Sequence, residues 1–189
     1  MIKLRIITGA LMLCLIPAAA RADLFSDWWL NTTNGASNAW SSNKYELLVP
    51  LRTYHVPASY SQHNLDKYNE AAWGIGLEKY YLDDKGDKHS LFIMTFQESH
   101  NNPQPTLGYS WQRTWYWNND PDNLGAGLGY SAILTFRRNF DYLPFPGILP
   151  VGSIEYQRLS MQAAWVPYMG YNNGNVFLIL AKWKFELDN

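Results

Sequence analysis

The stretch GYSWQRTWYW (Gly108–Trp117) decides the fold, because its large side chains recur at every second position. The odd positions, from Tyr109 to Trp117, carry four aromatic rings and one arginine, whereas the even positions are mostly small or polar. A period of two is typical of a β-strand whose two faces have different surroundings. The next run, LGAGLGYSAILTF (Leu124–Phe136), repeats the pattern, with glycine, serine and threonine opposite leucine, alanine and aromatic residues. Both runs therefore predict two-faced strands.

Similar alternation recurs through most of the chain and predicts eight strands in all. The six further runs begin at Tyr45, Trp73, Lys88, Gly147, Leu159 and Val176. Short turns such as Asp83–Asp87 alternate with longer connections, roughly Val56–Ala72, Ser99–Leu107, Arg137–Pro146 and Pro167–Asn173. Eight strands with short turns at one end and long loops at the other predict an all-β fold, an antiparallel up-and-down barrel.

Two kinds of barrel fit this pattern, one soluble and one in a membrane. A soluble, lipocalin-like barrel places its large apolar residues inside, whereas an outer-membrane barrel displays them to lipid. Here the glycines fall on the face that must be the inside, and the chain contains 9 Trp and 13 Tyr. We therefore predict an eight-stranded transmembrane β-barrel of the outer-membrane kind over residues 44–189, with the soluble barrel as the alternative.

Two segments precede the predicted barrel. Residues 1–22 combine a basic start, an apolar stretch and the motif ARA, which is typical of a signal peptide that is removed. The single cysteine, Cys14, lies in this segment, so we expect neither disulfides nor cysteine-bound metal in the mature chain. In residues 23–43, Phe25, Trp29, Ala36 and Trp40 recur at helical spacing and predict a short amphipathic helix at the membrane interface.

Charge and histidine spacing exclude several classes of function. The formal net charge is −1, which gives no electrostatic basis for binding nucleic acid. His63, His89 and His100 have no metal-ligand spacing with a carboxylate partner. No glycine-rich loop of the phosphate-binding kind occurs. We therefore expect no metal, no soluble cofactor and no nucleic acid.

The predicted interior contains many small residues. Parity places Gly74, Gly76, Ser110, Gly127 and Gly129 in the lumen. An eight-stranded barrel is just wide enough to be filled by its own side chains. Small residues at these positions predict a narrow slot for one hydrocarbon chain. The alternative is that the glycines only relieve crowding or mark kinks in the strands.

Prolines near strand ends suggest how a lipid reaches that slot. Proline cannot donate to the strand ladder and therefore opens it locally. Pro50 interrupts the first strand, Pro144 and Pro146 lie near the sixth, and Pro167 follows the seventh. We interpret Pro50, Pro146 and Pro167 as gating residues, with ordinary loop prolines as the alternative for Pro144 and Pro146.

Three reactive residues fall at one rim. If the chain starts in the periplasm, the first and third strands run outward and end at His55 and at Glu98–Ser99. A histidine beside a serine hydroxyl, with a carboxylate that orients the imidazole, suits acyl transfer. The alternative is that all three are solvated loop residues.

At these residues the chain resembles the PagP family of outer-membrane lipid A palmitoyltransferases. The likeness runs from about Trp40 to Phe185 and includes YELLVPLRTYH, DKYNEAAWGIGL, GYSWQRTW, LGAGLGYSA, DYLPFPGILP and GYNNGNVF. It implies transfer of a palmitoyl chain from the sn-1 position of a glycerophospholipid donor to a hydroxyacyl chain of lipid A in lipopolysaccharide. It also implies an integral protein of the Gram-negative outer membrane, and we expect a monomer.

The resemblance also assigns residues. The family's essential histidine falls on His55, and its Asp-Ser pair falls on Glu98-Ser99, where the glutamate is a departure. The gating prolines fall on Pro50 and Pro167, and the family's glycine at the floor of the acyl slot falls on Ser110. The rival hypothesis is a small outer-membrane barrel without enzymatic activity, with a structural or adhesive role.

Overall fold

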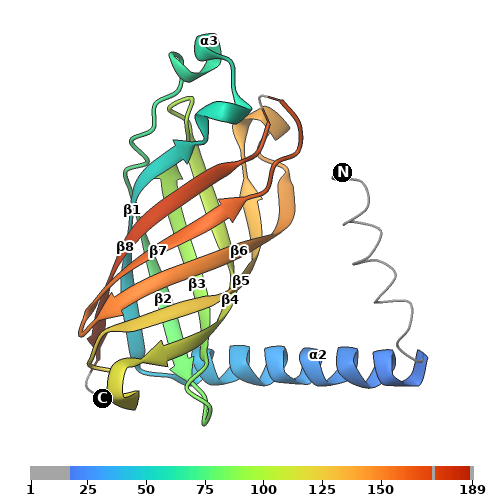
Figure 1. Cartoon of the computed structure of the whole chain (residues 1–189), viewed down its shortest axis with the longest axis vertical. Coiled ribbons are helices and arrows are strands. Elements are labelled where there is room, and N and C mark those ends of the chain that lie inside the picture. The colour runs from blue at the N-terminus through green and yellow to red at the C-terminus, as the bar shows by residue number, and fades with distance from the viewer. Residues whose placement is uncertain (1–17, 172, 188–189) are drawn as a thin grey trace. The chain divides into compact units, whose positions relative to one another are not determined.

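The computed structural model describes residues 18–171 and 173–187, and it confirms the predicted barrel. Eight antiparallel strands close in sequence order, β1 pairing with β8. Figure 1 shows them as a tilted ring of arrows. The strands are β1 (Lys44–His55), β2 (Gly74–Leu82), β3 (Lys88–Gln97), β4 (Pro103–Tyr116), β5 (Gly125–Phe136), β6 (Pro144–Tyr156), β7 (Leu159–Val166) and β8 (Val176–Glu186).

Burial follows the predicted parity in most strands, but in β1 the alternation shifts at an irregularity between Pro50 and Arg52, where Leu51 and Arg52 are both exposed. In β4, Ser110 and Gln112 face inward and are 1% and 2% exposed, whereas Trp115 faces outward and is 53% exposed. The outward face of the barrel carries exposed leucine, isoleucine and aromatic side chains on all sides. Examples are Leu47, Leu77, Ile93, Leu107, Leu128, Ile154, Met161 and Trp183. This is the pattern of a barrel with an apolar exterior.

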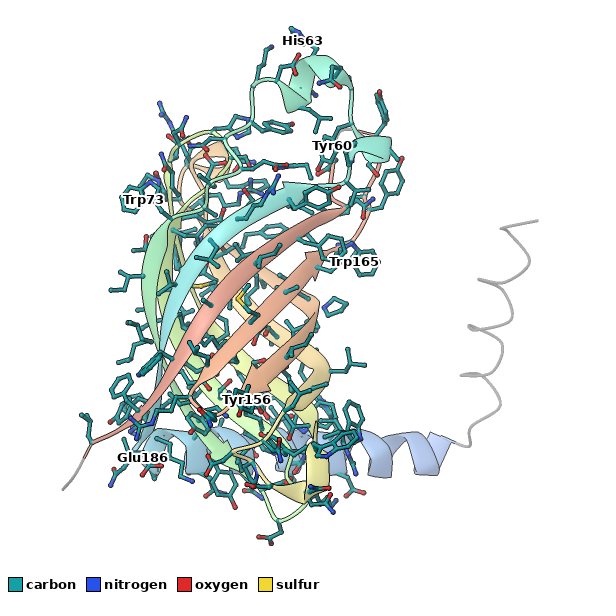
Figure 2. The ribbon with its side chains drawn as sticks, turned by 60° about the vertical axis from the view of Figure 1, so that its left-hand side comes forward. Tyr60, His63, Trp73, Tyr156, Trp165 and Glu186 are labelled. Carbon is teal, nitrogen blue, oxygen red and sulfur yellow. The ribbon has the colours of Figure 1, made fainter. Side chains whose placement is uncertain are left out.

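The two ends of the barrel differ, as predicted. At the end that we call the loop end, β1 leads into a long connection that contains η1 (Pro57–Ser59) and α3 (Gln62–Leu65). In Figure 2, Tyr60 and His63 lie on this connection, and Tyr156 and Glu186 lie at the opposite end, the turn end. Two single-turn helices complete the connections, η2 (Trp117–Asn119) at the turn end and η3 (Arg138–Phe140) at the loop end.

Two predicted connections are too long. We expected a connection over Arg137–Pro146, but β6 already begins at Pro144. We expected a loop over Ser99–Leu107, but β4 already begins at Pro103. The residues before Thr106 pair only with β3, because pairing with β5 begins at Thr106. Pro103 and Pro105 therefore lie where the strand has a free edge, the position in which a sheet tolerates proline.

The helix before the barrel is longer than predicted. Helix α2 spans Ala18–Ser41, whereas the sequence predicted residues 23–43. Of the predicted signal segment, residues 1–17 lie outside the described part of the chain. The chain falls into two compact units that divide between Asn34 and Gly35, and the barrel belongs to the second. In the described residues, no helix is both long and apolar enough to cross a membrane.

Charged side chains fill the lumen at the turn end. Lys88 Nζ lies 2.6 Å from Glu46 Oε1, and Lys182 Nζ lies 2.8 Å from Glu78 Oε2 and 3.6 Å from Glu46 Oε2. All four side chains are 6% exposed or less. Buried charges are tolerated when each has an opposite partner, and removal of one partner leaves an uncompensated charge. We call these four residues the lumen charge cluster.

The cluster generates a stability prediction. We expect Lys182→Met to lower the free energy of unfolding by about 3–5 kcal/mol, because Glu78 loses its cation. The double variant Glu78→Leu/Lys182→Met should recover most of that loss. Urea unfolding of the barrel in lipid vesicles measures both values. Lys44→Met, at an exposed lysine of β1, serves as the control and should change stability by less than about 0.5 kcal/mol. Equal stabilities for Lys182→Met and wild type would contradict the prediction.

Candidate functional site

The loop half of the barrel encloses a cavity of about 350 Å³. Apolar side chains from most strands form its wall. They include Leu48, Phe92, Met94, Phe96, Ile133, Leu149, Ala164, Leu178 and Leu180. Glu78, Ser131 and Gln162 also line the cavity, and His55, Glu98 and Ser99 line it on the side of the loops. The cavity is therefore apolar along its length, with polar groups toward both ends.

The small residues predicted to form the slot do not lie on this wall. A Cβ added to Gly76 would meet Met94 Cβ at 2.4 Å, and one added to Gly129 would meet the Trp111 carbonyl oxygen at 1.9 Å. A Cβ added to Gly74 would come equally close to the backbone of β3. The space beside Gly127 is occupied by the side chains of Ser153 and Gln112. The glycines thus allow neighbouring groups to approach closely and do not open space.

Ser110 lies beside the wall rather than on it. It pairs with Ser90 on β3 and with Ser131 on β5, and of these three serines only Ser131 lines the cavity. The Ser110 hydroxyl donates to the Tyr130 carbonyl at 3.2 Å. The three serines lie side by side across β3, β4 and β5, and Ser131 is the member of this row that reaches the cavity wall.

The structure brings His55 and Ser99 together. His55 is the last residue of β1 and Ser99 follows the end of β3, and they are 5% and 9% exposed. Ser99 Oγ and His55 Nε2 lie 3.2 Å apart, at hydrogen-bond distance. Both side chains line the cavity. This pair has the geometry of a hydroxyl and its general base.

A tight turn over Glu98–Asn102 fixes the position of Ser99. Glu98 N donates to the Asn102 carbonyl at 2.9 Å, and Asn101 N donates to the Glu98 carbonyl at 2.8 Å. Asn101 has a φ of 65°, a left-handed conformation that asparagine adopts more readily than most residues. The neighbouring loop reinforces the turn, since Asn69 N donates to the Ser99 carbonyl at 2.9 Å. The polar residues that follow β3 are therefore the residues that this turn requires.

Glu98, predicted to orient His55, makes its contacts elsewhere. Its Oε1 accepts from Asn102 Nδ2 at 2.8 Å, and its Oε2 faces His100 Nδ1 at 3.0 Å and Arg137 Nη2 at 3.8 Å. Burial raises the pKa of Glu98, but the hydrogen bonds from Asn102 and His100 outweigh it and hold the pKa below its usual value. Glu98 thus anchors its own turn.

Two tyrosines enclose the His55 ring. Tyr68 stacks on it with ring centroids 4.5 Å apart, and Tyr60 meets it edge-on at 5.1 Å. The Tyr60 hydroxyl donates to the Gly174 carbonyl, and Asn175 Nδ2 donates to Ser59 Oγ at 2.7 Å. The β1–β2 connection is therefore fastened over His55 by the β7–β8 loop. In Figure 2, Tyr60 lies on this connection above the strands.

The sequence reasoning missed Glu70, which lies on the same connection. Glu70 Oε1 accepts from the His55 backbone N at 3.1 Å and lies 3.6 Å from His55 Nδ1. Glu70 Oε2 accepts from Arg52 Nε at 2.9 Å and also from Arg52 Nη2. No periodic pattern marks a residue in a long loop. The available signal was the presence of Glu70 in the motif DKYNEAAWGIGL.

Two stretches of the barrel backbone lack a partner strand on one of their two sides. The β1–β2 ladder covers Tyr45–Leu48 and is resumed only by a bridge between Arg52 and Ala71, which leaves Pro50 between them. The β6–β7 ladder begins at Val151, so the earlier part of β6 pairs with β5 alone. Pro146 lies in that unpaired part, and Pro167 directly follows β7. We call these stretches the β1–β2 seam and the β6–β7 seam.

The family profile and the named relatives that match this chain all carry the same family name. The profile of a family described as "Antimicrobial peptide resistance and lipid A acylation protein PagP" matches residues 36–182. A protein of Laribacter hongkongensis named "Lipid A acyltransferase PagP" is 39% identical over 157 residues, 83% of this chain and 74% of its own length. A Salmonella typhi protein of the same name is 38% identical over 172 residues, 90% of this chain and 88% of its own.

The turn that carries Ser99 can be tested through Asn101. Its side chain accepts hydrogen bonds from Asn69 and Gln97, which both alanine and glycine would remove. Only alanine also retains a Cβ in the left-handed region, so Asn101→Ala should be less stable than Asn101→Gly by about 1–2 kcal/mol. Urea unfolding of the two variants measures the difference. Equal stability of the two variants would show that the turn relaxes to another conformation.

Proposed function

Because the chain belongs to the PagP family of lipid A acylation proteins, we propose how its His55–Ser99 pair serves this activity. The chain is a lipid A acyltransferase, with lipid A as acceptor and a lipid as donor. We propose that the donor is a glycerophospholipid that gives up its sn-1 palmitoyl or similar chain, and that a hydroxyacyl chain of lipid A receives it. The observation that carries the proposal is the His55–Ser99 pair beside an apolar cavity.

The cavity suits one acyl chain of the donor. Each methylene that moves from water into an apolar environment gains about 0.8 kcal/mol. A chain bound along Phe92, Met94 and Leu149 would place its ester group toward the loops, near His55 and Ser99. The apolar wall therefore favours a long hydrocarbon chain by burial, while the polar residues near the loops act on the ester.

The chemistry requires one base. The acceptor hydroxyl oxygen bonds to the ester carbonyl carbon as His55 Nε2 takes the hydroxyl proton. The bond from that carbon to the glycerol oxygen then breaks, and the departing oxygen receives the proton from the imidazolium. Atoms and charge balance without a soluble cofactor. The same base serves a transfer through Ser99 Oγ, in which the serine carries the acyl group between two such steps.

Access to the cavity is proposed through the two seams. An apolar exterior of this kind fits the outer membrane, where the barrel would be an integral monomer. A lipid tail crosses a closed barrel wall only where the backbone ladder is interrupted. The β1–β2 seam contains Pro50, and the β6–β7 seam lies between Pro146 and Pro167. We assign these three prolines to lipid gating at the two seams.

The proposed base and hydroxyl are tested by substitution. We expect His55→Ala and Ser99→Ala each to reduce acyl transfer at least a hundredfold, because each removes a group at the reacting centre. The assay uses purified protein in detergent, phosphatidylcholine as donor and lipid A as acceptor, with heat-modified gel mobility as a report of folding. His63→Ala, at an exposed histidine of α3, is the matched control and should keep the wild-type rate. Wild-type rates in folded His55→Ala would refute the assignment.

The rival function is tested in cells. A barrel with only a structural or adhesive role leaves lipid A unchanged. We expect mass spectra of lipid A to show one additional acyl chain when the gene is expressed, and to lose it with His55→Ala. Unmodified lipid A from cells with normal amounts of folded protein would favour the rival.

Chain length provides a further prediction. Ser110 adjoins Ser131 of the cavity wall, so Ser110→Gly should create room there and shift the preferred donor toward longer chains. One additional buried methylene is worth about 0.8 kcal/mol, or roughly fourfold in relative rate. Initial rates with phosphatidylcholines of graded acyl length measure the shift. Ser160→Gly, at a buried inward serine near the turn end, should leave the preference unchanged. The same preference in Ser110→Gly and wild type would remove Ser110 from the slot.

A further inference from the structure

The two ring nitrogens of His55 face different partners. Nε2 lies 3.2 Å from Ser99 Oγ, on the cavity side. Nδ1 is buried and lies 3.6 Å from Glu70 Oε1. A general base needs one nitrogen directed at the hydroxyl and gains from an acceptor at the other, which fixes the ring orientation and tautomer. The carboxylate in that second position is Glu70.

We propose that Glu70 is the positioning carboxylate of His55, and that Glu98 does not have this role. The inference rests on the proposed function, in which His55 Nε2 takes the hydroxyl proton. Glu70 acts through His55 and does not touch the substrate. It replaces the assignment of Glu98, which rested on its position at the rim and on the family resemblance.

The Glu70 carboxylate is held in one orientation from both sides. Oε1 accepts from the His55 backbone N, and Oε2 accepts from the Arg52 guanidinium. A carboxylate gripped by arginine retains its charge, and the pKa of Glu70 reflects this: burial raises it, but the hydrogen bonds from Arg52 and His55 N lower it further. Glu70 thus remains an anion beside His55. Arg52 on β1 and Glu70 on the connection together anchor the base.

Glu98 occupies a different position. Its two oxygens are engaged by Asn102, His100 and Arg137, and among the described residues Glu98 makes no hydrogen bond or ion pair with His55. The other titratable groups around His55 are the stacked Tyr68, the edge-on Tyr60 and, beyond Tyr68, His100. Of the groups in ring or ion-pair contact with His55, Glu70 is the one that carries negative charge at neutral pH.

The role follows from the charge change at His55 during the reaction. When Nε2 takes a proton, the ring becomes a cation with Nδ1–H directed at Glu70. The carboxylate then stabilises this cation, so the barrier for proton removal falls. Without the negative charge, the imidazolium forms less readily and protonation of the resting base requires lower pH. By analogy with the outer partners of metal-bound histidines, whose removal typically costs roughly 10- to 100-fold, we expect a loss of that order here.

The test is Glu70→Gln, which keeps an oxygen for the His55 backbone N and removes the charge. We expect the rate at saturating phosphatidylcholine to fall roughly tenfold to a hundredfold with little change in KM. The acidic limb of the kcat/KM profile should move to lower pH. Glu70→Asp should recover part of the rate. Asp66→Asn removes the same charge from an exposed position on the same connection and should leave rate and profile unchanged.

Two further measurements secure the outcome. In nitrogen-15 NMR of histidine-labelled protein, Glu70→Gln should move the titration of the His55 ring to lower pH, whether or not the enzyme is assayed. If Glu70→Gln fails to fold, Arg52→Gln, which loosens Glu70 without removing its charge, should still lower the rate, by a smaller factor.

The possible results separate the hypotheses. An acidic limb that moves in Glu98→Gln but not in Glu70→Gln would overturn the inference, as would a wild-type rate, profile and NMR titration in Glu70→Gln. A folded wild-type enzyme without acyl transfer would refute the proposed function, and the NMR titration would then still decide whether Glu70 governs His55.

Discussion

The interior of an eight-stranded barrel has room for little more than its own inward side chains, and the rest of this molecule depends on that limit. Any space for a ligand must come from the choice of inward residues, strand by strand. In the turn half, long charged side chains meet across the lumen and fill it. In the loop half, many inward residues are apolar, with threonines among them, and a cavity of about 350 Å³ remains between them. The same eight strands therefore close the lumen in the turn half and leave a cavity in the loop half.

The same limit places the reactive groups at the loop end. Within the strands, an inward residue has only lumen neighbours, whereas at the rim a side chain can be reached from two connections. His55 ends β1, yet its partners come from the β1–β2 connection and from the turn after β3. Hydrogen bonds from the β7–β8 loop close this arrangement from above. The rigid barrel thus positions the reactive side chains at connections that are hydrogen-bonded to one another.

The sequence predicts the barrel well because its information is periodic. Parity alone assigned the inward and outward faces of β4 and β5, and the chain direction assigned His55 and Ser99 to one rim. Two expectations depended on contacts that no period encodes. Gly129 was taken as open space, although it permits close approach of the Trp111 backbone. Glu98 was expected to orient the imidazole, but the carboxylate beside the imidazole is Glu70, 15 residues from His55 in an irregular connection, and only the folded loop reveals this.

The lumen charge cluster has a consequence for the order of events in each turnover. It fills the barrel beneath the cavity, so a hydrocarbon tail has no path through the turn end. In the proposed function, a tail that has entered through a seam can leave only through one of the two seams and not through the turn end. In that function, the chain in the cavity after transfer belongs to the lipid A product, so this chain must leave before the chain of a fresh donor can enter. The same buried ion pairs fill the lumen at the turn end, so we do not expect the barrel to act as an open pore.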